Sequence, residues 1–309
     1  MKLASRSFWT AIAVVLLAAV PVVVPGYLTS LATLVLIYAL LAMSVDILAG
    51  FTGRTPLCHG AIFGTATYVV MYYVTTAGGN PWLALLFGIA AAVAVSLIFA
   101  LLAVRTTGVY FLLLTLALGM IVWGVCQRWT SATGGENGLR GQVRPEVVAD
   151  PMRFYYFVLA VALLATFVMW RFVRSPFGLT LKGIRESESR MRSLGYNTTH
   201  HLLLGFLFSG LMAGVSGVLY AYFNSFVSPS SVALAQSVKG LLMVIVGGVG
   251  TLFGGVVGAA VIIVLENVVS SFTERWSMVL GLLFVLTMIF APEGIVGKLR
   301  SHLVRGHQR

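Results

Sequence analysis

The chain has 309 residues, of which 59% are hydrophobic and 9% charged, and its formal net charge is +11 at pH 7. Several apolar runs approach the length of a membrane-spanning helix, so the sequence predicts an all-α, polytopic membrane protein. A porin-type barrel is excluded, because its short strands would alternate between apolar and polar residues. The cations flank the apolar runs, so topology and the anionic headgroups of the lipid bilayer explain the net charge better than nucleic acid does.

The apolar runs each predict a helix, and we expect about 8–10 transmembrane helices in a single transmembrane domain, residues 1–309. The first run follows a basic start, as in a signal peptide, but no small-residue cleavage site follows it. We therefore expect an uncleaved first helix. In chain order the runs are about 8–25, 27–48, 60–77, 81–104, 108–127, 154–173, 201–223, 238–265 and 276–291.

Basic residues predict the orientation of the helices. Lys2 and Arg6 place the N-terminus in the cytoplasm, because cationic segments stay on that side. Alternate crossings then put Arg105 inside, the 128–153 loop outside and the 174–200 loop inside.

The basic tail, residues 291–309, is also expected to be cytoplasmic. Nine single crossings would leave it outside. The run at 238–265 is too long for one untilted span, and glycines weaken its centre. We therefore predict two segments, or a broken pair, that meet near Gly250.

Two glycine-rich stretches interrupt the apolar pattern at similar places in the two halves of the chain. The first contains Gly50, Gly53 and Gly60, and the second contains Gly248 and Gly250. Interrupted segments at matching places in a transporter indicate a central binding region built from broken helices. The alternative is that these glycines only allow close helix packing.

Two residues of opposite charge lie just before and within the first stretch. In a straight helix Asp46 and Arg54 would be about 12 Å apart. A chain break would let Arg54 fold back and neutralise Asp46; alternatively both are solvated at the headgroup level. His59 is better explained as a structural histidine at a helix end than as a substrate ligand. The predicted pathway residues are Asp46, Gly50, Gly53, Arg54, His59, Gly60, Gly248 and Gly250.

The densest run of charge lies at 175–197, between two apolar runs. From Arg171 to Arg192 the chain carries six cations against Glu186 and Glu188. Each Arg or Lys costs about 2.5–3.5 kcal/mol at the centre of a span, so this segment must be an ordered polar loop outside the hydrocarbon.

The loop has the sequence features of one short helix. Ser175 is the expected N-cap, Pro176 the first helical residue and Gly195 the C-terminal stop. Such a helix either rests on anionic lipid or docks on a soluble cytoplasmic partner, and its mixed charge favours the partner. Its expected apolar stripe is Ile184, Met191 and Leu194.

No catalytic motif is visible in the sequence, which lacks HExxH, GxSxG, CxxC and the phosphate-binding loop GxxxxGK[ST]. We therefore expect no enzymatic activity and no cofactor. A stand-alone ion-coupled carrier is the alternative from another functional class. Asp46 and Glu266 are the only acids that it could use in the apolar runs, and this scarcity argues against it.

The order and spacing of seven stretches resemble the permease subunits of branched-chain amino acid ABC transporters, specifically the second of their two permease types. Each stretch alone is weak evidence, but their joint order is specific. They are GFTG…HGAIFG at 50–64, RTTGVYFLLLTLALG at 105–119, TGGENGL at 133–139, SPFG…IRESESRMRSLGYN at 175–197, GLMAGVSGVLYAYFNSFVSP at 210–229, LLMVIVGGVGTLFGGVVGAA at 241–260 and FAPEGIVG at 290–297.

The resemblance implies an inner-membrane importer subunit that passes branched-chain or other small amino acids. Its partners would be a second permease subunit, cytoplasmic ATPase subunits that bind the ATP, and a periplasmic solute-binding protein. Related permeases carry urea and short amides, which are the alternative substrates. The 174–200 loop would couple the permease to the ATPase subunits through Arg185, Glu186, Glu188, Arg190, Leu194 and Gly195.

The chain departs from the family pattern LNLLxGYxGQxSLGHA, where it has VDILAGFTGRTPLCHG. Asp46 replaces the family's Asn, Arg54 its Gln, Pro56 its Ser and Cys58 its Gly. Two neutral positions have gained opposite charges, which favours the pairing of Asp46 with Arg54 and weakens any transfer of substrate identity.

Overall fold

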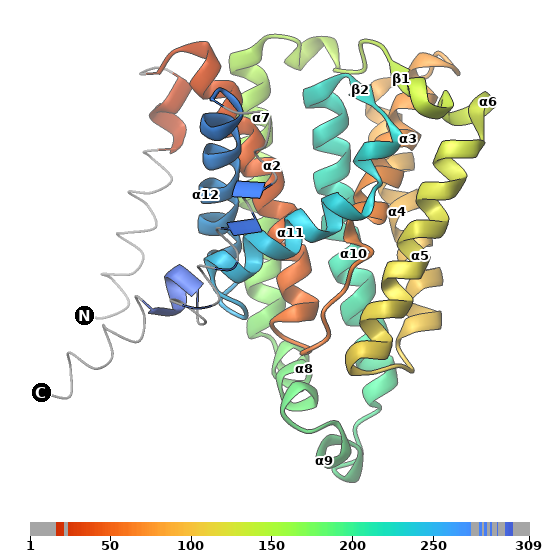
Figure 1. The fold of residues 1–309 in the computed structure, drawn as a ribbon, viewed down its shortest axis with the longest axis vertical. Coiled ribbons are helices and arrows are strands. Elements are labelled where there is room, and N and C mark those ends of the chain that lie inside the picture. Colours follow the sequence, from red (N-terminus) through yellow and green to blue (C-terminus); the bar gives the residue numbers. More distant parts are fainter. Residues whose placement is uncertain are drawn as a thin grey trace, which may run out of the picture.

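The computed structural model describes residues 17–21, 24–272, 278–279, 281–282, 285, 289 and 294–298, which form a bundle of long helices (Figure 1). The expected first helix, the run at 276–291 and the basic tail lie wholly or mostly outside these residues. Within them, seven segments are long and apolar enough to cross a membrane, so the predicted fold class is confirmed. These segments are Gly26–Ala49, Pro81–Ala103, Gly108–Arg128, Pro151–Arg174, Thr198–Asn224, Pro229–Gly247 and Phe253–Ser270.

The helices follow the apolar runs closely. Polar N-caps followed by proline begin three of them: Asn80 before α4, Asp150 before α7 and Ser175 before α8. In chain order the helices are α2 (Gly26–Ala49), α3 (His59–Thr75), α4 (Pro81–Ala103), α5 (Gly108–Arg128), α6 (Thr130–Thr133), α7 (Pro151–Arg174), α8 (Pro176–Glu186), α9 (Glu188–Ser193), α10 (Thr198–Asn224), α11 (Leu234–Gly247) and α12 (Phe253–Ser270).

Helix α2 lies at the centre of the bundle and packs against α7, α10, α11 and α12. Every residue from 36 to 48 is buried, which is possible because the helix is apolar on all sides. In contrast, α4 and α5 expose large apolar side chains, among them Leu86, Ile98 and Ile121. These two helices present the kind of surface that lipid covers.

Two long helices of opposite direction are each followed by a segment that turns back into the bundle (Figure 1). After α2, residues 50–58, here called the first linker, lead to α3. After α10, residues 225–233 lead to α11 from the other end. The starts of α3 and α11 meet, because the backbone N–H of Gly60 donates to Ser237 Oγ at 2.8 Å. This inverted arrangement is typical of transporters.

The 128–153 loop is ordered and packs onto the return segment after α10. Its strand β1 (Leu139–Arg140) pairs antiparallel with β2 (Phe226–Val227). Arg144 lies 4.1 Å over the ring of Phe154, and its Nε donates to the carbonyl of Tyr222 at 3.1 Å. The loop also contains the 3-10 turns η1 (Gly135–Asn137) and η2 (Glu146–Val148), and η3 (Pro229–Ser231) follows β2.

The charged loop, residues 175–197, lies at the opposite end of the bundle (Figure 1). Ser175 caps α8 as predicted, accepting from Gly178 N–H at 3.3 Å. The prediction of one helix is wrong. Ser187 is extended and accepts from Arg190 N–H at 3.3 Å, so it begins a second helix, α9. Gly195, at φ +86°, follows the end of α9.

The expected apolar stripe is divided between two environments. Ile184 is buried with Val104 and Leu202, and Met191 packs against this small cluster, which holds the loop against α4 and α10. Leu194, in contrast, is 67% exposed. Ile184 and Met191 therefore anchor the loop to the bundle, whereas Leu194 stays accessible on its surface.

The predicted break in the run at 238–265 is confirmed. Helix α11 ends at Gly247 and α12 begins at Phe253, and residues 248–252, here called the second linker, join them. Gly250 has φ +78°, a conformation that favours glycine.

Candidate functional site

Asp46, near the end of α2, binds the second linker. Its Oδ1 accepts the backbone N–H of Gly250 at 2.6 Å, and its Oδ2 accepts that of Leu252 at 2.9 Å. The side chain is completely buried. The hypothesis that Asp46 pairs with Arg54 is wrong, because its two carboxylate oxygens accept from backbone amides and Arg54 binds Glu188 instead. The alternative, that both residues are solvated, is also wrong, because both side chains are buried.

The chemistry of the second linker explains why an acid suits position 46. The two amides of residues 250 and 252 precede the first turn of α12, where negative charge is favourable. A carboxylate accepts from both amides, whereas an asparagine side chain has one acceptor oxygen and would turn its NH₂ group toward the other donor. Asp46 thus fastens the second linker to α2.

Gly50 allows the two linkers to touch. A Cβ atom at this position would overlap both Asp46 Oδ1 and the backbone nitrogen of Gly250. The two glycine-rich stretches that the sequence singles out therefore do come together. They meet by close backbone packing at the charged-loop end of the bundle.

Arg54, in the first linker, reaches the charged loop. Its Nη2 donates to Glu188 Oε2 at 3.0 Å, and its Nη1 donates to the carbonyls of Val104 and Thr106 at 2.6 and 2.9 Å. The side chain is only 7% exposed. Burial lowers the pKa of its guanidinium, and the carboxylate of Glu188 opposes that fall. Arg54 thus joins the end of α4 to the start of α9.

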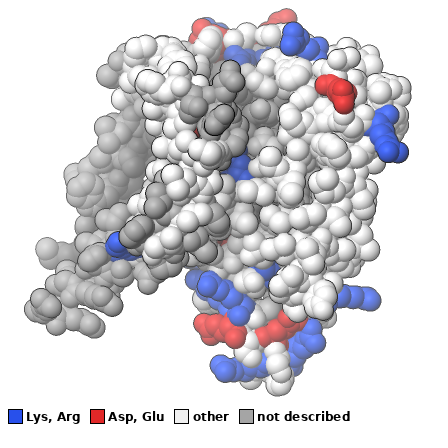
Figure 2. Space-filling model, in the orientation of Figure 1, with Lys and Arg blue, Asp and Glu red and all other residues white. Residues whose placement is uncertain are grey.

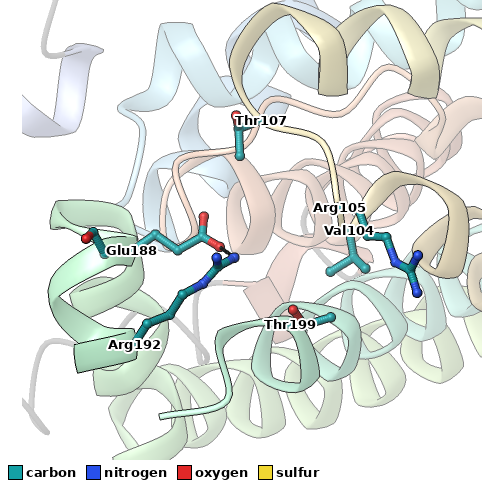
Figure 3. Close-up of a pocket in the computed structure, with 7 residues that line it drawn as sticks. Val104, Arg105, Thr107, Glu188, Arg192 and Thr199 are labelled. Atoms are coloured by element: carbon teal, nitrogen blue, oxygen red, sulfur yellow. Dashed lines mark hydrogen bonds and ion pairs between the residues drawn. The ribbon is translucent and has the colours of Figure 1, made fainter. Parts of the chain in front are cut away.

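The carboxylate of Glu188 is shared between two arginines. Its Oε1 accepts from Arg192 Nη2 at 2.6 Å and from Thr198 Oγ1 at 3.3 Å, so α9 is tied to α10 as well. Figure 3 shows Arg192 and Glu188 pointing toward each other on one wall of a pocket, across from Arg105. The pocket lies between the charged loop and the α4–α5 turn.

Helix α8 contacts the first linker directly. Arg185 Nη1 donates to the carbonyl of Gly50, and the aliphatic part of Arg185 lies against Gly53. Lys182 Nζ lies 5.1 Å from the centre of the Phe51 ring. We call this set of contacts, with the Arg54–Glu188 pair and the Asp46 hydrogen bonds, the polar junction. It connects the charged loop to the first linker, which packs against the second linker at Gly50.

The predicted coupling residues fall into two groups. Arg185 and Glu188 bind the first linker, so they join the loop to the bundle. The other four lie on the exposed surface of the loop, where charges of both signs gather (Figure 2). These four are Glu186, Arg190, Leu194 and Gly195.

The predicted pathway residues also separate. Six of them belong to the polar junction or adjoin it, whereas His59 and Gly60 lie where α3 and α11 begin. His59 is buried, and its Nε2 is 2.7 Å from Ser209 Oγ, which donates to the carbonyl of Ser44 at 2.6 Å. His59 Nδ1 has no hydrogen-bond partner among the described residues.

One charged pair escaped the sequence reasoning. Lys239, on α11, lies 2.5 Å from Glu266, on α12, measured from Nζ to Oε2. Glu266 stands out in the sequence as one of few acids near the apolar runs, whereas Lys239 is not among the predicted site residues. A search of the run at 238–265 and its ends for charges of both signs would have found the pair, because buried opposite charges in a membrane are generally close partners.

Comparisons with known proteins agree on one family. The family model described as "Branched-chain amino acid transport system / permease component" matches residues 27–288. The chain is 29% identical to the high-affinity branched-chain amino acid transport system permease protein LivM of Escherichia coli, over 94% of this chain and 74% of that protein. It is 28% identical to LivM of Salmonella typhimurium, over 90% and 73%.

A second type of permease is similar over a comparable length. The chain is 24% identical to LivH of Salmonella typhimurium, over 84% of this chain and 91% of that protein. No solved structure matches the chain.

Proposed function

This chain belongs to the permease family of branched-chain amino acid transport systems, and from that premise we propose that it forms one half of the translocation pathway of an ABC importer for branched-chain or other small amino acids. A second permease subunit supplies the other half. A periplasmic solute-binding protein delivers the substrate, and cytoplasmic ATPase subunits bind ATP. The chain itself has no catalytic activity and no cofactor in this proposal.

The observation that carries the proposal is the polar junction. An importer driven by separate ATPase subunits needs a surface that they can push and a connection from that surface to the helices that gate the pathway. The charged loop has an exposed face, and its inward face is bonded to the first linker through Arg185 and Glu188. The first linker in turn packs against the second linker at Gly50. The exposed face is where the ATPase subunits dock.

The orientation follows from charge. The charged-loop end is cytoplasmic, because cationic loops stay on that side of the membrane. The β1–β2 end then faces the periplasm, where the binding protein docks. By the same rule of charge, we propose that the basic N-terminus and the basic tail are cytoplasmic.

We propose that six of the eight pathway residues act through the polar junction. Asp46, Gly50, Gly53 and Arg54, with Gly248 and Gly250 of the second linker, transmit movement of α8 and α9 to α2 and α12. His59 and Gly60 lie deeper, where α3 and α11 meet, and belong to the pathway region. A movement of the charged loop would therefore shift both linkers together. Such a joint movement is what a permease needs to open its pathway to one side of the membrane and close it to the other.

A stand-alone ion-coupled carrier is the competing class. Such a carrier needs a buried acid that is available to a coupling ion. Asp46 is occupied by two amides and Glu266 by Lys239. Neither carboxylate that the sequence offers for this role is unpaired, so the geometry favours the importer.

Purification of the chain with its ATPase subunits tests the proposal. We expect the ATPase subunits to co-purify with the wild-type permease and with Arg153→Glu, a charge reversal at the far end. Arg190→Glu combined with Leu194→Asp should abolish co-purification. Uptake of an amino acid by the permease alone, driven by an ion gradient, would overturn the proposal.

A further inference from the structure

Lys239 and Glu266 form an ion pair within the part of the bundle expected to lie in the membrane. Their helices, α11 and α12, both belong to segments long and apolar enough to span it. The side chains are 14% and 22% exposed, so the pair is largely withdrawn from the surroundings of the chain but is not sealed off.

Aromatic and polar side chains surround the pair. Lys239 Nζ lies 4.3 Å from the centre of the Tyr38 ring, and Tyr38 Oη accepts from Gln236 Nε2 at 3.0 Å. The rings of Phe63 and Tyr220 pack on Tyr38, at centroid distances of 6.1 and 6.0 Å. The cluster draws residues from α2, α3, α10, α11 and α12, so it lies where the two halves of the fold meet.

The pair is not needed to hold α11 against α12. A Cβ at Gly258 would overlap the carbonyl oxygen of Met243, and a Cβ at Gly247 would overlap that of Gly254. The two helices therefore already pack backbone to backbone. A charged group is expensive in a membrane, and a buried pair is often no more stable than apolar residues of similar volume. Helix packing therefore does not explain why the chain carries these two charges.

Resting on the proposed function, we propose that Lys239 and Glu266 recognise the two charges of a zwitterionic amino acid during its passage. The α-carboxylate of the substrate binds Lys239, and the α-ammonium binds Glu266 and the face of Tyr38. The empty site is neutral because its two charges pair. A zwitterion replaces that pair with two new ones, so no unpaired charge is left buried.

This chemistry selects a class of substrate. Urea and short amides carry no separated charges, so they cannot compensate for parting Lys239 from Glu266. An amino acid amide carries only the ammonium and would leave Lys239 unpaired. The site therefore favours α-amino acids over the alternative amide substrates and places no demand on the amino acid side chain.

The test uses the complete importer in proteoliposomes with saturating leucine-loaded binding protein. Lys239→Met combined with Glu266→Leu removes both charges and keeps the volume. The swapped variant, Lys239→Glu with Glu266→Lys, restores an ion pair in reverse. We expect both to assemble and both to reduce the maximal rate of leucine uptake by about tenfold or more, a loss of about 1.4 kcal/mol. Arg171→Gln, which removes an exposed cation at the end of α7, is the matched control.

The outcomes separate the possible failures. If the swapped variant transports leucine at the wild-type rate, the pair is structural and this inference is wrong. If the uncharged variant does not assemble, the single variants Lys239→Arg and Glu266→Asp provide the test. Each keeps the sign of the charge but changes the position of the charged group. An unchanged uptake rate in these two overturns the inference. If the wild-type importer carries no amino acid at all, the proposed function fails as well.

Discussion

Glu188 and Arg54 lie 134 positions apart in the chain and form an ion pair at 3.0 Å between Oε2 and Nη2. The pair joins α9, in the charged loop, to the first linker. The same guanidinium satisfies two carbonyls at the end of α4, so Arg54 connects three parts of the fold.

Removal of this arginine should destabilise the permease. In Arg54→Gln the carbonyls of Val104 and Thr106 lose a charged donor. Glu188 keeps Arg192 and the hydroxyl of Thr198 but loses its buried cationic partner. We expect the free energy of unfolding to fall by about 1–3 kcal/mol, measured as thermal unfolding in detergent. Arg171→Gln should change it by less than about 0.5 kcal/mol. Equal shifts in the two variants would contradict the assignment.

Asp46→Asn tests the hydrogen bonds to the second linker. The asparagine can accept from one of the two amides, and its NH₂ group then faces the other. We expect a loss of about 1–3 kcal/mol from the unsatisfied buried amide. Hydrogen exchange of the amides of Gly250 and Leu252 is the direct measurement, because at least one should lose its protection. Unchanged protection of both amides would show that the carboxylate is not required.

Gly50→Ala tests the contact between the linkers. The new methyl group would overlap Asp46 Oδ1 and Gly250 N, so the two linkers must move apart. We expect severe destabilisation, by about 3 kcal/mol or more, seen as loss of folded protein on size-exclusion chromatography. Gly124→Ala is the matched control. It lies inside α5 with open space at its Cβ, and alanine should stabilise that helix slightly. Wild-type behaviour of Gly50→Ala would rule out the close approach.

Arg144→Gln tests the far end of the bundle. Arg144 stacks on Phe154 and donates to the carbonyls of Tyr222 and Ala149, so it holds the 128–153 loop on the ends of α7 and α10. We expect faster proteolysis within this loop and a loss of about 1–2 kcal/mol in stability. Arg153→Gln, at an exposed position nearby, should leave the cleavage pattern unchanged. Unaltered proteolysis of Arg144→Gln would mean that the loop is held by β1 and β2 alone.

The sequence predicts those features that depend on neighbouring residues. The spans follow from apolar length, the cap at Ser175 follows from the Ser-Pro pair, and the break near Gly250 follows from glycine content. The sequence analysis predicts one helix across Ser187, although a serine followed by an acidic residue, here Glu188, is a local signal for the start of a helix. Ser187 lies inside a stretch whose other residues favour a helix, so the sequence pattern indicates one continuous helix.

The partners of the buried charges could not be predicted. Asp46 and Arg54 are close in sequence and opposite in charge, which made their pairing attractive. However, Asp46 binds backbone amides, and the sequence cannot indicate which amides, because nearly every residue has one. Arg54 finds Glu188 only because α9 folds under the first linker. Both contacts depend on tertiary structure, and so does the Lys239–Glu266 pair.

The central claim is that the polar junction transmits the movement of the charged loop to the linkers. A double-mutant cycle of Arg54→Gln and Glu188→Gln, read out as leucine uptake per ATP hydrolysed by the reconstituted importer, tests it most directly. We predict that each single variant uncouples hydrolysis from uptake and that the double variant is no worse than either one. The resulting coupling energy should be about 1 kcal/mol or more. The claim would be contradicted if the losses of uptake per ATP in the two single variants multiplied in the double variant. It would also be contradicted if both single variants kept the wild-type uptake per ATP.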